Sequence, residues 1–196
     1  MRVRISHMML ALAVTVVPGC GSSATSESAS RTSSWASLKV DANEVESFAT
    51  LKEMSDKAEL VVRGKVVAID GARVAGSDLG AATAHFVTYQ LVVEWAKGPT
   101  RKGTVLPVEF FATNGARPFD EWLKDLQSSP FPQDTVYFLR EKKDGSNAYR
   151  IVNSFGLWEQ KGNSVKAPLS DDGSPSKYEA ETLKFKSLDD LIKSVS

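Results

Sequence analysis

The sequence predicts a mainly β (α+β) fold, which is an antiparallel β-barrel or meander. Three helices are expected with it: one at the N-terminal end, a short inserted one and one at the C-terminal end. Three observations support this prediction. Residues 59–70 are rich in β-branched side chains, residues 86–95 alternate apolar with polar side chains, and residues 134–166 contain short apolar runs separated by glycine-containing turns.

The first predicted elements are a helix and a long strand. Apolar residues in 44–58 recur near helical spacing, and Asp41 or Asn43 is available as the N-cap, so we expect a short amphipathic helix. In 59–70, Gly64 interrupts the β-branched run, which indicates a strand with a bulge or a sharp bend.

A glycine-rich segment and a strand follow. Residues 70–84 hold few large apolar side chains, and their glycine spacing does not match a dinucleotide site, so we expect an exposed loop. In 86–95, every second residue is apolar, which predicts a half-buried strand; these residues are Val87, Tyr89, Leu91, Val93 and Trp95.

A basic turn at 97–103 joins this strand to another at 104–113, and the two predict a hairpin. Pro107 lacks an amide donor, so the second strand should lie at an edge or carry a bulge. A short helix with an apolar face is expected at 119–126.

The rest of the chain predicts a meander and a final helix. Short strands are expected at 134–141, 149–153, 157–160 and 164–166, and a polar loop at 170–176. Ser187 is placed to cap a terminal helix that begins at Leu188.

The amino-terminal segment has the layout of a secretory signal. Arg2 and Arg4 precede an apolar stretch from Met8 to Val17, and small or turn-forming residues lead to Cys20. A membrane-spanning helix needs about 20 apolar residues, so this stretch is too short to span a bilayer.

The run Val17-Pro18-Gly19-Cys20 resembles the lipobox of bacterial lipoproteins. The resemblance implies a signal peptide at 1–19, a diacylglycerol thioether on Cys20, and an N-acyl chain such as palmitate after cleavage. It implies a protein held by lipid to the cell membrane or outer membrane and facing the extracytoplasmic side. The alternative is an ordinary secretory signal that leaves a free thiol.

Removal of residues 1–19 takes away two arginines, leaving 24 − 2 = 22 basic against 24 acidic residues. This balance gives no basis for nucleic-acid binding. Residues 20–43, rich in Ser and Thr, predict a disordered tether, and residues 44–196 a single β-rich domain.

Four segments, at 58–66, 89–93, 97–98 and 136–139, resemble a recurring pattern in uncharacterised bacterial lipoproteins. The same strand order is similar to the oligonucleotide/oligosaccharide-binding (OB) barrel of tissue metalloproteinase inhibitors and netrin-like domains. Those inhibitors use a free amino-terminal cysteine and several disulfides. The single, acylated cysteine expected here means that protease inhibition by chelation does not carry over.

No catalytic or metal-binding residues are predicted, and no cofactor beyond the lipid. His85 is the only histidine of the mature chain and lacks a partner motif, so a structural role is favoured. The candidate ligand-binding residues are three tryptophans, whose alternative is a place in the core, and three cations of the basic turn, whose alternative is a solvated turn. They are Trp95, Trp122, Trp158, Lys97, Arg101 and Lys102.

These observations favour a non-enzymatic binding or interaction module whose partner is an envelope protein or a glycan. An extracytoplasmic hydrolase with dispersed catalytic residues is one alternative. An envelope structural or assembly protein is another, and it would expose a large apolar patch.

Overall fold

The chain divides into two units, Met1–Arg31 and Thr32–Ser196, and all described residues belong to the second. The structure is a computed structural model, and it describes residues 35, 38, 47–75, 84–112, 118–169 and 178–196. Its elements are α1 (Leu51–Lys57), β1 (Leu60–Ala75), β2 (Ala84–Lys97), β3 (Val105–Ala112), α2 (Phe119–Ser128), β4 (Thr135–Glu141), β5 (Tyr149–Ile151), β6 (Leu157–Lys161), β7 (Ser164–Lys166), α3 (Glu179–Thr182) and α4 (Leu188–Val195).

Five of the strands close into a barrel in the order β1-β2-β3-β5-β4, with β4 pairing back onto β1. This confirms the predicted β-barrel with helices. The prediction that the sheet is antiparallel throughout is wrong, because β3 and β5 are parallel at Val108 and Tyr149. A closed ring with an odd number of strands cannot alternate direction at every pair, so one pair must be parallel. Strands β6 and β7 extend the sheet from β4.

Strand β4 separates two hydrophobic cores, and Thr135 to Leu139 are all buried. Tyr137 and Leu139 face the barrel interior, with Val87, Tyr89, Val108 and Phe110. Val136 and Phe138 point the other way, to a second core formed with α1 and α4. A strand covered on both faces is expected to be apolar at consecutive positions, as β4 is.

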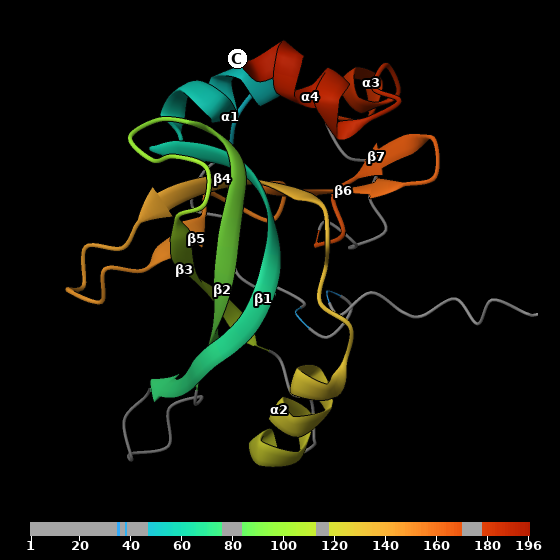
Figure 1. Cartoon of the computed structure of the whole chain (residues 1–196). Coiled ribbons are helices and arrows are strands. Elements are labelled where there is room, and N and C mark those ends of the chain that lie inside the picture. Colours follow the sequence, from blue (N-terminus) through green and yellow to red (C-terminus); the bar gives the residue numbers. More distant parts are fainter. Residues whose placement is uncertain (1–34, 36–37, 39–46, 76–83, 113–117, 170–177) are drawn as a thin grey trace, which may run out of the picture. The chain divides into compact units, whose positions relative to one another are not determined.

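Helices α1 and α4 lie side by side over the second core (Figure 1). Ser187 caps α4 by accepting from the Asp190 amide, as predicted. The predicted start of the first helix is wrong: residues 47–50 are not helical, and Thr50 caps α1 by accepting from the Glu53 amide. The helix begins there because Thr50 has an extended backbone conformation and a side-chain oxygen that accepts from a first-turn amide.

Strand β1 is longer than predicted. It continues to Ala75, paired with β2 in a long curved ribbon (Figure 1), so the expected loop from 70 is wrong as far as Ala75, and residues 76–83 lie outside the described ranges. The composition of this segment by itself predicts a loop, but hydrogen bonding to β2, whose apolar and polar residues alternate, stabilises it as a strand. The bulge predicted at Gly64 is confirmed by a register shift between Arg63 and Gly64.

Trp35 and Leu38 are buried in the barrel core, at 1% and 0% exposure. The predicted boundary, which assigns 20–43 to the tether and starts the domain at 44, is therefore wrong: the domain begins no later than Trp35. A large aromatic side chain gains too much from burial to remain in a solvated linker.

We predict that Gly64→Ala destabilises the fold by about 2 kcal/mol, because a Cβ at Gly64 would lie 2.3 Å from the Val92 carbonyl oxygen. Gly71→Ala, in the same strand, is the matched control: a Cβ there meets nothing within 4 Å, and we expect a change below about 1 kcal/mol. Urea unfolding measures both free energies, and equal values for the two variants would contradict the packing argument.

Candidate functional site

Three side chains form a row across the outer face of the barrel. Arg73 on β1 is opposite Phe86 on β2, which is opposite Phe111 on β3. The phenyl rings meet edge to face with centroids 5.6 Å apart, and the Arg73 guanidinium carbon lies 4.2 Å from the Phe86 centroid. This geometry gives an aromatic pair with a cation held over one ring.

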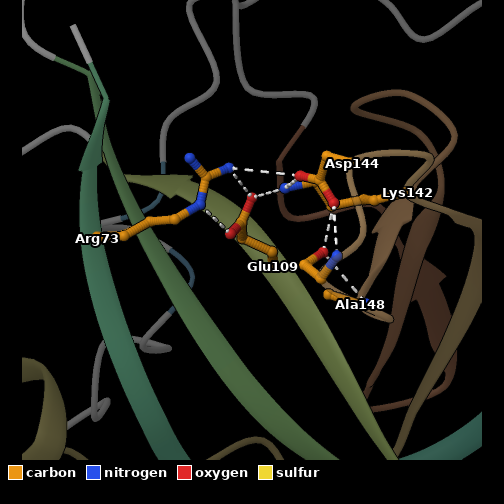
Figure 2. Close-up of polar contacts among 6 residues, drawn as sticks. Arg73, Glu109, Lys142, Asp144 and Ala148 are labelled. Carbon is orange, nitrogen blue, oxygen red and sulfur yellow. Dashed lines mark hydrogen bonds and ion pairs between the residues drawn. The ribbon is translucent and has the colours of Figure 1, made fainter.

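Glu109 is buried beside this row. It lies two residues before Phe111 on β3, so both side chains are on the same face of the strand, and it is only 6% exposed. Its carboxylate accepts from Nε and Nη2 of Arg73 at 2.6 and 2.7 Å and from Nζ of Lys142, as Figure 2 shows. The bidentate contact fixes the plane of the guanidinium.

The turn between β4 and β5 supplies the remaining charges. The Lys142 amide donates to the Ala148 carbonyl at 2.8 Å and closes the turn. Asp144 accepts from the Ser146 amide at 3.1 Å, a turn-stabilising contact typical of Asp. Its carboxylate also pairs with Lys142 at 2.8 Å and lies 4.0 Å from Arg73 (Figure 2).

We call these residues the hairpin-end site: Arg73, Phe86, Glu109, Phe111, Lys142 and Asp144. Its two cations and two carboxylates balance, so its formal charge is zero. The site joins the far end of the β1–β2 ribbon to the β4–β5 turn.

The pKa values of the site follow from its contacts. Burial by itself raises the pKa of Glu109, but hydrogen bonds from Arg73 and Lys142 outweigh it and hold the pKa below the usual range. The Lys142 ammonium, assisted by Ser146, holds the pKa of Asp144 well below its usual range. The Arg73 pKa is raised by its hydrogen bonds to Glu109. The two carboxylates and the Arg73 guanidinium are therefore charged at neutral pH.

No protein-family model, curated protein or solved structure matched this chain.

The structure does not bring the three predicted tryptophans together in one groove. Trp122, on α2, is 4% exposed in the barrel core, whereas Trp158, on β6, is 2% exposed in the second core. Trp95 is half-buried against that second core. Trp122 and Trp158 pack inside the protein and offer no surface to a ligand.

The predicted basic residues also separate. Lys97 donates to the Ser55 hydroxyl at 3.0 Å and to the Val195 carbonyl at 2.6 Å, so it fastens α1 and the end of α4 to the barrel. Arg101 and Lys102 are exposed in the turn between β2 and β3. Lys97 therefore holds the structure together at this end and is not part of an open basic surface.

His85 lies on β2 with its ring stacked on Phe119, at a centroid distance of 4.2 Å. Among the described residues, no carboxylate pairs with it, and no group of three or more His, Cys, Asp or Glu side chains is arranged to hold a metal ion. In the same part of the chain, no helix is long and apolar enough to cross a bilayer. Cys20 lies outside the described residues.

Sequence reasoning missed the hairpin-end site because its members are distant along the chain: 36 residues separate Arg73 from Glu109, and 33 separate Glu109 from Lys142. One signal was present. Glu109 is the only charged residue of the apolar strand β3, and a carboxylate in such a strand is stable only with a partner.

We predict that Glu109→Gln destabilises the protein by about 3 kcal/mol at pH 7, because it removes the buried charge that pairs with both Arg73 and Lys142 and leaves these cations with the more exposed carboxylate of Asp144. Glu94→Gln is the matched control on β2: its carboxylate is 40% exposed and 3.7 Å from Lys65, so we expect less than about 0.5 kcal/mol. Urea unfolding at pH 7 compares the two, and similar losses would contradict the assigned role of Glu109.

We also predict that the destabilisation caused by Glu109→Gln depends on pH. Since the folded-state pKa of Glu109 lies below its ordinary 4.5, the stabilisation by its carboxylate is complete above that value and is lost as the pH falls. The difference in unfolding free energy between wild type and Glu109→Gln should therefore shrink below about pH 4.5. A difference that stays constant from pH 7 to pH 3 would rule out a carboxylate-specific effect.

Proposed function

We propose that this protein is a lipid-anchored extracytoplasmic binding module, attached through Cys20, and that the hairpin-end site is its ligand surface. The proposal for the anchor rests on the leader and the lipobox-like run ending at Cys20. The proposal for the site rests on one observation above all: a guanidinium fixed by a buried carboxylate on the face that OB barrels use for binding.

Binding fits this site better than catalysis. Glu109 accepts from two cations and has a lowered pKa, so it is a weak general base. Arg73 keeps 46% of its side chain exposed although its orientation is fixed, and it remains accessible to a ligand. A preoriented, accessible donor lowers the ordering cost of binding.

A hydroxyl-rich glycan is the ligand class that this site favours. The charges within the site sum to zero, so it does not attract a polyanion by its net field. Arg73 offers donors and Asp144, 44% exposed, offers acceptors, which together match the hydroxyl groups of a sugar. Of the described residues, none provides an observation that favours the hydrolase or assembly-protein alternatives over binding.

For the anchor, we predict that Cys20→Ser abolishes incorporation of labelled palmitate into the expressed protein, because the serine hydroxyl does not form the thioether. Ser22→Ala, two residues away, should incorporate label as the wild type does. Labelled lipid is detected after gel separation, and undiminished labelling of Cys20→Ser would refute the anchor.

For the site, we predict that Arg73→Ala weakens binding to an array of bacterial envelope polysaccharides by at least about 10-fold, the loss expected for one charged hydrogen bond. Arg101→Ala removes the same charge from the β2–β3 turn, and we expect less than a twofold change. Circular dichroism confirms the fold of both variants. No saturable binding by the wild type, or a larger loss for Arg101→Ala, would overturn the proposal.

A further inference from the structure

Trp35 inserts into the barrel from outside its strands. Its ring packs among three aromatic side chains of the interior, with centroids 5.4 Å from Phe110, 5.8 Å from Tyr89 and 6.3 Å from Tyr137. These partners come from β2, β3 and β4, so the indole is surrounded by three different strands of the barrel wall.

The barrel does not need Trp35 for its backbone hydrogen bonding. The ring of strands closes through pairs between residues 60–151, and none of these pairs includes Trp35. Leu38, whose amide donates to the Trp35 carbonyl at 2.9 Å, is buried in the same core. Trp35 is thus a side chain placed inside a barrel that is closed without it.

Three buried hydroxyl groups of the barrel strands, in the part of the chain that the structure describes, have no hydrogen-bond partner within 3.5 Å. The hydroxyls of Tyr89, Tyr137 and Thr135 are buried and have no hydrogen-bond partner among the described residues. Thr135 and Tyr137 are both 0% exposed and lie two residues apart on β4, facing the same side. Burial strongly raises the pKa of Tyr137.

Such groups are costly to leave without a partner, and the cost is incurred in the part of the core that holds Trp35. The indole of Trp35 fills the volume between the aromatic rings, but it leaves these hydroxyls without a hydrogen bond. A ring of similar size that carries its own hydroxyl would keep the aromatic contacts and also bond to Tyr89, Tyr137 or Thr135.

We propose that the barrel interior is a binding site for a small planar aromatic molecule bearing a hydroxyl group, and that Trp35 is the chain's own occupant of this site. This site is separate from the hairpin-end site, because its residues face the opposite side of the barrel wall. Its ligand class follows from the two features that line it, aromatic faces and unsatisfied hydroxyls.

The first test uses the mature full chain with Trp35→Gly, titrated by calorimetry with indole and with 4-, 5- and 6-hydroxyindole. We expect at least one hydroxyindole to bind five times more tightly than indole, the gain of about one hydrogen bond. Adding Tyr137→Phe and Thr135→Val should reduce this preference. Trp158→Gly, which opens a similar volume in the second core, should show no such preference.

The second test uses the unmodified chain, so it stands even where Trp35→Gly fails to fold. The indole N–H resonance of Trp35, assigned by its loss in Trp35→Phe, should shift towards the solvent-exposed position on addition of the best hydroxyindole, and the Trp158 resonance should not move. An unmoved Trp35 resonance at millimolar ligand would overturn the proposal. So would equal binding of indole and all hydroxyindoles, the result expected where internal water alone satisfies the hydroxyls.

Discussion

The fold depends on closure of the barrel at the start of β1, where this strand is paired on both edges at once. Val61 to Gly64 face β2 on one side and β4 on the other. At Gly64 the neighbouring strand approaches so closely that a Cβ would lie 2.3 Å from the Val92 carbonyl oxygen. Gly64 is also the last residue of β1 paired with β4, and the register shift against β2 at this point lets the strand bend round the barrel.

Closure at one end also assembles the hairpin-end site. Beyond Gly64, β1 leaves β4 and runs on with β2 alone, which carries Arg73 beyond the closed ring to the β4–β5 turn. Glu109 receives Arg73 from β1 and Lys142 from the turn, so one buried carboxylate ties together three parts of the barrel. A buried ion pair adds little net stability compared with apolar packing, but it fixes the geometry of its members.

Much of the fold was predictable because local patterns determine it. The alternation of β2, the doubly buried run of β4 and the Ser187 cap each reflect contacts within or near the element itself. The strand conformation at the glycine-rich end of β1 was not predictable, because it comes from pairing with β2. The hairpin-end site was beyond reach for the same reason: nothing local to Arg73 indicates that Glu109 lies beside it.

Trp35 shows the limit of composition as a guide. It stands directly after a Ser/Thr-rich run, so the composition of its neighbours predicts a tether, whereas its burial depends on three aromatic residues more than fifty positions away. A single large side chain is enough to recruit a polar segment to a core, because full burial of an aromatic residue contributes about 1.5–3 kcal/mol. Domain boundaries drawn from averaged composition miss such isolated anchors.

Strand β3 connects the two proposed sites physically. Phe110 packs on Trp35 inside the barrel, while its neighbours Glu109 and Phe111 belong to the hairpin-end site on the outer face. Because successive residues of a strand point to opposite faces, the backbone that positions Phe110 also positions the carboxylate holding Arg73. Repacking around Phe110 would therefore have to be accommodated by the same strand that carries Glu109. The two sites are thus built on opposite faces of one closely packed strand.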